Sequence, residues 1–194
     1  NSCHIHLSFR DKKDNPILAG ESGDGLSNEG RSYIAGIQKH MRELTMLFAP
    51  NINSYKRYQA GTFAPTAIKW GRDNRTCALR LVGQGQSLRV ENRVPGGDVN
   101  PYLAVAGMIA AGLSGIEEKL QLEPIFQGNA YALETDRVPT SLKEARDLWA
   151  NSAWVKETFG EEVQKHYTHM ADTELDAFGR AVTDWERFRS FERM

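Results

Sequence analysis

The sequence predicts an α+β fold in which an antiparallel sheet comes first and packed helices follow. Residues 2–10 alternate between apolar and polar side chains, which is the period of a half-buried strand. Residues 75–82 and 87–94 repeat the strand-like pattern on either side of the turn-forming residues 83–86, so we expect them to form a hairpin. Strands and helices do not alternate as they would in a βαβ protein, which favours the α+β class.

Helices are predicted from apolar spacing and from capping residues. The first begins at Ser27 or Asn28 and ends before Pro50. Its apolar stripe consists of Tyr33, Ile34, Ile37, Met41, Leu44, Leu47 and Phe48. The second covers residues 102–120 and is capped by Asn100, and its many Ala and Gly residues predict tight packing against a neighbour.

The C-terminal part is expected to be helical as well. Ser141 caps a short helix that ends near Ala150. A longer amphipathic helix follows, marked by Val163, Tyr167, Met170, Leu175, Phe178, Val182, Trp185 and Phe188. Residues 11–30 and 51–74 lack this periodicity, so we expect a surface loop and an irregular segment there.

The composition is that of one globular unit, with 194 residues, 40% hydrophobic and 25% charged. Within residues 1–194 we expect a site-bearing part, 1–120, and a mainly helical part, 121–194. A net charge of −1 gives no bulk electrostatic reason to bind nucleic acid or an anionic membrane. Cys3 and Cys77 lie far apart without a CxxC spacing, so a reduced, cytoplasmic protein is expected. Because the chain opens on a strand pattern without Met, we expect it to be part of something longer.

Two strand faces carry the groups best suited to catalysis. His4 and His6 share the polar face of the first strand, where imidazole nitrogens can bind a metal ion or phosphate. Glu91 lies between Arg89 and Arg93 on one face of the third strand; a carboxylate binds hard divalent ions, and guanidinium forks bind oxyanions. Plainer explanations exist for both motifs: histidines bonded to neighbours, and a solvated ion-pair ladder that contributes under about 1 kcal/mol.

Arginine is frequent in the central stretch, and acids are few. The arginines are Arg57, Arg72, Arg75, Arg80, Arg89 and Arg93. Only Asp73 and Glu91 accompany them, and the use of Arg rather than Lys favours recognition of planar oxyanions. A Walker A loop, a dinucleotide-binding glycine motif and a nucleophile elbow are all missing from the sequence. We therefore expect part of the active site of an enzyme that handles a metal ion and phosphate.

An ordered set of motifs resembles the carboxy-terminal half of the catalytic domain of bacterial glutamine synthetases. They are HIHLS at 4–8, GLSNEGRSYIAGIQKH at 25–40, NSYKR at 53–57, DNRTCALR at 73–80, RVENRVP at 89–95 and NPYLAVAGMIAAGL at 100–113. Their order makes the resemblance more specific than any single motif. It implies an antiparallel sheet with packed helices and an ATP-dependent ligase, which phosphorylates glutamate on its γ-carboxylate before an amine forms the amide.

The resemblance also implies a role for each matching residue. His4 and Glu91 would bind one of two divalent ions, Mg²⁺ or Mn²⁺. Arg57 and Arg93 would hold glutamate. Arg75 would be the catalytic arginine, near both the glutamate γ-carboxylate and the transferred phosphate. Nucleotide and phosphate would be contacted by His6, Leu7, Ser8, Arg75, Arg80 and Arg89.

Two departures from the family pattern modify these expectations. In ammonia-using members, a glutamate in the loop after NSYKR closes the site and accepts a proton from the incoming nitrogen. Phe63 stands there, so we expect a larger amine: a polyamine, an alkylamine or ethanolamine, as in the γ-glutamylpolyamine synthetase branch, although Phe63 could also be simple loop packing. The ligands of the other ion would precede His4, so we expect the 194 residues alone to be inactive.

Other hypotheses stay open. The nearest alternative is a glutamine synthetase that uses ammonia. An alternative of another class is a non-catalytic relative that serves as an assembly module, and a guanidino-kinase-like phosphotransferase is more remote. The expected partners are L-glutamate, an amine and ATP, without nucleic acid or membrane. A homo-oligomer is inferred only from the rings of the family, which are often dodecameric.

Overall fold

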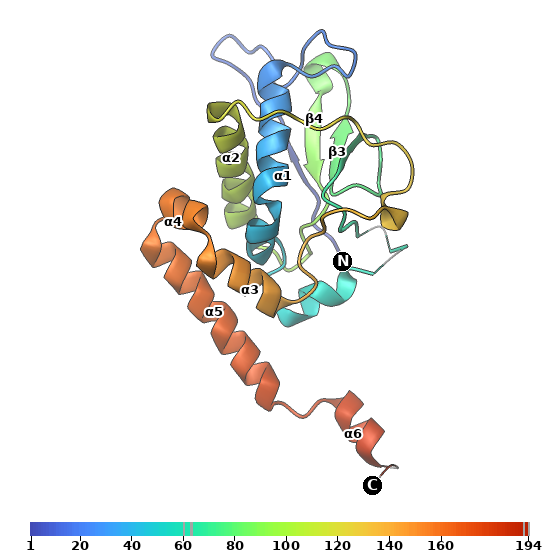
Figure 1. The fold of residues 1–194 in the computed structure, drawn as a ribbon, viewed down its shortest axis with the longest axis vertical. Coiled ribbons are helices and arrows are strands. Elements are labelled where there is room, and N and C mark those ends of the chain that lie inside the picture. The colour runs from blue at the N-terminus through green and yellow to red at the C-terminus, as the bar shows by residue number, and fades with distance from the viewer. Residues whose placement is uncertain (60, 63, 192, 194) are drawn as a thin grey trace.

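The computed structural model contains a four-stranded sheet, two long helices beside it and a helical arm at the C-terminus (Figure 1). It describes residues 1–59, 61–62, 64–191 and 193. The strands are β1 Ile5–Leu7, β2 Trp70–Arg72, β3 Leu79–Val82 and β4 Arg89–Asn92. Their order in the sheet is β1-β4-β3-β2. The α+β class is therefore confirmed.

β4 pairs antiparallel with both β1 and β3, whereas β2 is parallel to β3. The predicted strands at 2–10, 75–82 and 87–94 are confirmed in type, although each is shorter than expected. The hairpin connection contains a 3-10 turn, η2 Gly85–Ser87. The expectation that residues 51–74 are irregular is wrong in part, because this segment contains β2 and the 3-10 helix η1 Ile52–Arg57.

The first long helix, α1, spans Asn28–Phe48 and begins as predicted. Ser27 is its cap, since the Ser27 hydroxyl accepts a hydrogen bond from Gly30 N at 2.8 Å. Every residue of the predicted apolar stripe is buried. These side chains pack with those of β3, β4 and α2 in one hydrophobic core.

The second long helix, α2, spans Pro101–Glu117 and is capped by Asn100. It approaches α1 so closely that side chains are excluded from two positions. A Cβ at Gly36 would lie 2.1 Å from Ala111 O, and one at Gly115 would lie 2.1 Å from Ser32 O. The predicted tight packing is confirmed, and it depends on glycine on both helices.

The C-terminal third is helical, as expected. After η3 Ala130–Ala132 come α3 Leu142–Asn151, α4 Ala153–Phe159, α5 Glu161–Arg180 and α6 Asp184–Phe191. Ser141 caps α3, where its hydroxyl accepts from Glu144 N at 3.2 Å. None of the described helices is long and apolar enough to cross a membrane.

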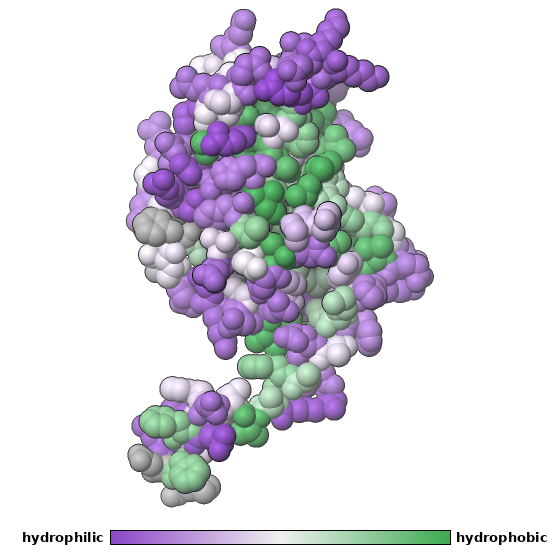
Figure 2. All heavy atoms as spheres, turned by 180° about the vertical axis from the view of Figure 1, so that it is seen from behind, coloured by the Kyte–Doolittle hydropathy of each residue, from purple (hydrophilic) through white to green (hydrophobic). Residues whose placement is uncertain are grey.

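The prediction of one long amphipathic helix near the C-terminus is wrong. The helix breaks after Arg180, and Thr183 with Glu186 then starts α6: Thr183 N donates to Glu186 Oε2 at 2.7 Å, and Glu186 N donates to Thr183 Oγ1 at 3.4 Å. Trp185 and Phe188 are 69% and 80% exposed, so the far end of the stripe is not part of the core. In Figure 2, α6 forms a lobe apart from the main body, with apolar side chains on its surface.

Candidate active site

Glu91 lies at the centre of a polar row across the sheet. In the strand register it is opposite His6 on β1 and opposite Arg80 on β3. Directly paired residues point to the same face of a sheet, so an imidazole, a carboxylate and a guanidinium stand side by side. Glu91 is only 2% exposed, although its two neighbours in the row are more open to solvent.

Four side chains surround the Glu91 carboxylate. Its Oε1 is 2.8 Å from Arg93 Nη1, 3.0 Å from His4 Nδ1 and 3.7 Å from His6 Nε2. Its Oε2 is 3.0 Å from Arg80 Nη1. A buried carboxylate is costly unless charges and hydrogen bonds compensate for lost water, and the two guanidinium groups do so here. The site is thus organised before any ligand arrives.

Glu91 is ionised at neutral pH. Burial raises its pKa, but the hydrogen bond from Arg80 and the positive charges of Arg93 and Arg80 bring the pKa below its ordinary value. The carboxylate therefore carries the full negative charge that a hard cation requires.

His4 is held in its neutral form. Burial and the charge of Arg93 lower its pKa, although the charge of Glu91 acts in the opposite direction. Its Nε2 is buried and has no hydrogen-bond partner among the described residues. A neutral imidazole beside an ionised carboxylate is a donor set that divalent ions accept.

The spacing of these two groups also suits a shared ion. His4 Nδ1 and Glu91 Oε1 are 3.0 Å apart. Adjacent ligands of an octahedral ion with bonds of about 2.1 Å have about this separation. The pair is nevertheless incomplete, because the described residues contain no group of three or more His, Cys, Asp or Glu side chains placed to hold an ion.

Arg80 is engaged from both sides. Its Nη1 donates to Glu91, while Nε donates to Asp73 Oδ1 at 2.9 Å and Nη2 pairs with the same oxygen. Burial lowers the pKa of Arg80, but the hydrogen bonds to Asp73 and Glu91 outweigh that effect and raise it. A phosphate contact by Arg80 stays a prediction; the bonds to Asp73 and Glu91 leave guanidinium N–H groups on Nη1 and Nη2 that could make it. The pairing with Asp73 was not foreseen, since no spacing rule connects it with β3.

Within the described part of the chain, the remaining predicted arginines form no ion pair with Glu91, and they bond or lie elsewhere. Arg57 lies at the end of η1 and donates through Nη2 to Val94 O, and its charge contributes to the lowered pKa of His4. Arg89 is half-buried and donates to Ser87 O at 3.1 Å. Arg75 is exposed in the connection between β2 and β3.

Two further predicted residues add nothing to the described geometry. Ser8 is exposed just beyond β1, and no hydrogen bond links it to Glu91 or its neighbours in the described part of the chain. Phe63, predicted to line the amine pocket, falls outside the described residues. The structure thus brings together His4, His6, Arg80, Glu91 and Arg93.

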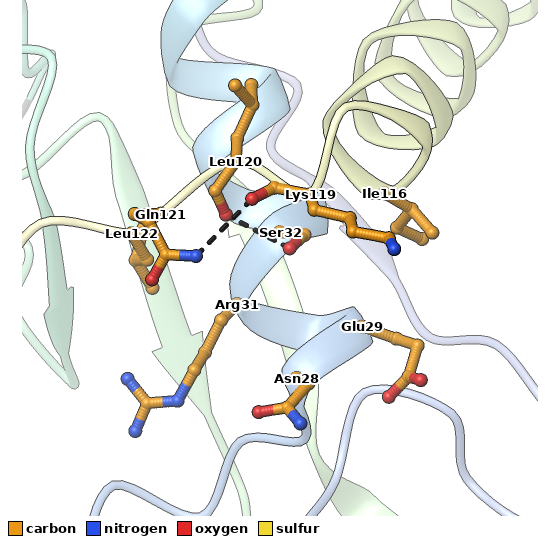
Figure 3. Close-up of a pocket in the computed structure, with 9 residues that line it drawn as sticks. All are labelled: Asn28, Glu29, Arg31, Ser32, Ile116, Lys119, Leu120, Gln121 and Leu122. Atoms are coloured by element: carbon orange, nitrogen blue, oxygen red, sulfur yellow. Dashed lines mark hydrogen bonds between the residues drawn. The ribbon is translucent and has the colours of Figure 1, made fainter.

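A separate hollow lies between the first turn of α1 and the end of α2 (Figure 3). It is lined by Asn28, Glu29, Arg31, Ser32, Ile116, Lys119, Leu120, Gln121 and Leu122. Two of its polar groups have local partners: Ser32 Oγ donates to Leu120 O at 3.0 Å, and Arg31 pairs with Asp24 at 2.7 Å. No residue assigned to the site from the sequence lines it.

Comparison with known proteins gives a consistent result. Residues 1–190 match the family of glutamine synthetase catalytic domains. Over its whole length the chain is 59% identical to a gamma-glutamylethanolamide synthetase of Streptomyces coelicolor, and it covers 42% of that protein. Over 97% of its length it is 37% identical to a glutamate–isopropylamine ligase of Pseudomonas sp, again covering 42% of that protein.

Solved structures agree with these relatives. The structure of apo GmaS without ligand superposes with a TM-score of 0.87 at 29% sequence identity, covering 96% of this chain and 44% of that one. A GmaS/ADP complex gives the same TM-score at 27% identity, covering 99% of this chain and 46% of that one. The chain thus spans less than half the length of the proteins that it matches.

Proposed function

Because the chain belongs to the glutamine synthetase family, as the C-terminal part of its catalytic domain, we propose that the protein is an ATP-dependent ligase that joins the γ-carboxylate of L-glutamate to an amine. The observation that carries the proposal is the buried, ionised Glu91 held among His4, Arg80 and Arg93. Such a buried charge is costly, and the same core could be filled by apolar side chains at little loss of stability. This argues against a non-catalytic assembly module.

In the proposed reaction, a γ-carboxylate oxygen attacks the terminal phosphorus of ATP and ADP leaves. The amine nitrogen then attacks the acyl carbon, phosphate leaves, and the nitrogen loses a proton. Arg57 and Arg93 would hold glutamate, while Arg75, Arg80 and Arg89 would bind the phosphates. Guanidinium groups fixed in advance stabilise the developing charge without reorganisation.

His4 and Glu91 would hold a Mg²⁺ or Mn²⁺ ion, and His6 and Ser8 would lie along the nucleotide. When bound, the ion would offset negative charge on the phosphate oxygens. The neutral imidazole and the ionised carboxylate support this assignment. The remaining ligands would come from the rest of the protein.

The amine is proposed to be larger than ammonia. Phe63 stands where ammonia-using members carry a glutamate. The relatives that are 59% and 37% identical are named for ethanolamide and isopropylamine chemistry, which supports ethanolamine or an alkylamine. Ammonia is the second candidate, because a type-1 glutamine synthetase of Dictyostelium discoideum is 40% identical over 98% of the chain.

An amine screen on the full-length protein tests the proposal, with ADP release and product mass as readouts. We expect ethanolamine, isopropylamine, putrescine or spermidine to exceed ammonia in kcat/KM by about tenfold or more. A preference for ammonia overturns the amine class, and absence of glutamate-dependent ADP release with every amine overturns the ligase. Phe63→Glu is expected to shift the preference towards ammonia, and Phe63→Leu is the matched control.

The cellular setting and assembly are proposals as well. Consumption of ATP fits a cytoplasmic enzyme, and Cys3 and Cys77 are free thiols, as a reducing compartment would keep them. A homo-oligomer rests on the family alone. Size-exclusion chromatography with light scattering of the full-length protein would measure it.

A further inference from the structure

Asp98 connects the loop after β4 with the 3-10 helix that carries Arg57. Its Oδ2 accepts hydrogen bonds from Ser54 Oγ at 2.6 Å and from Asn51 Nδ2 at 3.1 Å. Asn51 precedes η1 and Ser54 lies within it, whereas Asp98 lies between β4 and α2. One carboxylate oxygen therefore ties together two segments that are far apart in sequence.

The Ser54 hydroxyl has two tasks at this junction. It donates to Asp98, and it accepts a hydrogen bond from Asn51 N at 3.0 Å, which caps the start of η1. Ser54 is 6% exposed. Because a hydroxyl has a single proton, the bond to Asp98 fixes its orientation and leaves a lone pair for the amide. Asp98 thus orients the Ser54 hydroxyl that caps the start of η1.

The other end of η1 is fastened to the same loop. Arg57 Nη2 donates to Val94 O, and Tyr58 Oη donates to the same carbonyl at 3.1 Å. Val94 directly follows Arg93, which is buried against Glu91. Residues 94–98 therefore hold η1 at both ends, and they attach Arg57 to the segment that follows β4, which begins with Arg93.

The space around Arg57 is shaped by this arrangement. Its Nε is buried without a hydrogen-bond partner in the described part of the chain, and Arg57 and Asp98 line one hollow with Asn1, Asn53, Ser54 and Gly97. A Cβ at Gly96 would lie 2.4 Å from Asp98 Oδ1 and 3.8 Å from Arg57 Nε. A side chain at position 96 would thus displace Asp98.

Asp98 is charged in this setting. Burial raises its pKa, but the hydrogen bonds from Ser54, from Asn51 and from its own amide bring the pKa below its ordinary value, and the charge of Arg57 adds to this. An ionised acceptor makes shorter and stronger hydrogen bonds than a neutral one, which suits a clamp.

We propose that Asp98 is a positioning residue: through Ser54 and η1 it holds Arg57 at a fixed place relative to Arg93, so that both guanidinium groups meet glutamate together. The inference rests on the proposed function, and it assigns Asp98 no contact with substrate. A displacement of a binding group by about 1 Å can cost up to about a hundredfold in rate, so a clamp outside the site can affect it strongly.

The test uses the full-length protein with Asp98→Ala, Asp98→Asn and Ser54→Ala. Asp98→Ala is expected to raise KM for glutamate about tenfold while KM for ATP stays within about twofold. Asp98→Asn keeps an oxygen acceptor and is expected to give a smaller rise. Because Ser54 and Asp98 act in one chain of bonds, the double alanine variant should be no worse than Asp98→Ala.

Asp172→Ala is the matched control. Asp172 accepts from Arg146 Nε at 2.7 Å and from Nη2 at 2.9 Å, so it is a comparable clamp between α3 and α5, away from the sheet. Its loss is expected to leave both KM values within about twofold.

The outcomes separate this inference from the proposed function. An active wild type with unchanged KM for glutamate in Asp98→Ala overturns the inference alone. If KM for glutamate and KM for ATP rise equally in Asp98→Ala, and Asp172→Ala shows the same rise, the fold has loosened generally. That result also overturns the inference. A wild type without glutamate-dependent turnover overturns both. If Asp98→Ala does not fold, Asp98→Asn and Ser54→Ala decide by the same split of KM values.

Discussion

Arg80 and Glu91 face each other across the β3–β4 pair, with Arg80 Nη1 3.0 Å from Glu91 Oε2. Asp73 holds the same guanidinium from the other side. Arg93 and His4 approach the second oxygen of Glu91. Arg80 and Arg93 therefore keep the Glu91 carboxylate charged. Removal of this carboxylate would leave the two guanidinium groups without their buried counter-charge.

Replacing Glu91 by Gln should weaken the use of a divalent ion. A neutral amide oxygen is a poorer ligand than a carboxylate, so the Mn²⁺ concentration for half-maximal activity is expected to rise by about tenfold or more. A Mn²⁺ titration of ADP release by the full-length protein measures this. Glu123→Gln is the control, because Glu123 pairs with Lys69 outside the Glu91 cluster. An unchanged Mn²⁺ dependence in Glu91→Gln would rule out Glu91 as a ligand.

Arg93→Lys should weaken glutamate binding although the charge is kept. Arg93 is 4% exposed and donates to Glu91 at 2.8 Å, and lysine cannot bond Glu91 and a substrate carboxylate with one planar fork. KM for glutamate is expected to rise by about tenfold, measured by steady-state kinetics. Arg146→Lys alters an equally paired arginine between α3 and α5 and should not change it. Equal KM values in both variants would contradict the assignment.

Cys77 should resist alkylation in the folded protein. It is fully buried, and burial raises its pKa to about 11 from an ordinary value of 9.0. Because only the thiolate reacts, its reactive fraction at pH 8 is lowered about a hundredfold. The raised pKa also affects the free energy of unfolding. The thiol ionises at a lower pH in the unfolded chain than in the folded one, so the folded state loses stability as pH rises from about 9 to about 11.

Mass spectrometry after iodoacetamide treatment at pH 8 measures this resistance. The half-buried Cys3 should be modified well before Cys77, and both should react in urea. Equal labelling of the two thiols in the folded protein would show that the Cys77 environment is open.

The isolated 194-residue chain should not form amide from glutamate, an amine and ATP. His4 and Glu91 are an incomplete donor set, because the described residues contain no group of three or more His, Cys, Asp or Glu side chains placed to hold an ion. Product detection by mass spectrometry checks this, with the full-length protein as the positive control. Measurable ATP-dependent amide formation by the isolated chain would contradict it.

The helices were predictable because their ends are encoded locally. Ser27, Asn100 and Ser141 each cap the helix that follows, and the stripe of α1 is buried as its spacing predicts. The break before α6 was also encoded, in the Thr183-x-x-Glu186 capping box. It was missed because apolar spacing alone continues across it, and the exposure of Trp185 depends on packing that periodicity does not contain.

β2 could not be predicted from its own residues. Trp70–Arg72 is three residues long, and its strand character comes from parallel pairing with β3. Asp73 follows it with φ of 52°, a left-handed conformation, and its carboxylate accepts a hydrogen bond from Arg80. The family that the resemblance named is confirmed by the match over residues 1–190, whereas the roles of the site residues stay predictions. The contacts of Arg80 and the clamp at Asp98 needed the folded chain, because they join segments that are not adjacent in sequence.

The central claim, ligation through a γ-glutamyl phosphate, is tested most directly by isotope transfer. Full-length protein is incubated with ATP, ethanolamine and glutamate labelled with oxygen-18 in the γ-carboxylate, and the released phosphate is analysed by mass spectrometry. One labelled oxygen in the phosphate for each amide formed is the expected result, since phosphate leaves with the oxygen that attacked ATP. Unlabelled phosphate, or ATP hydrolysis without amide, would contradict it.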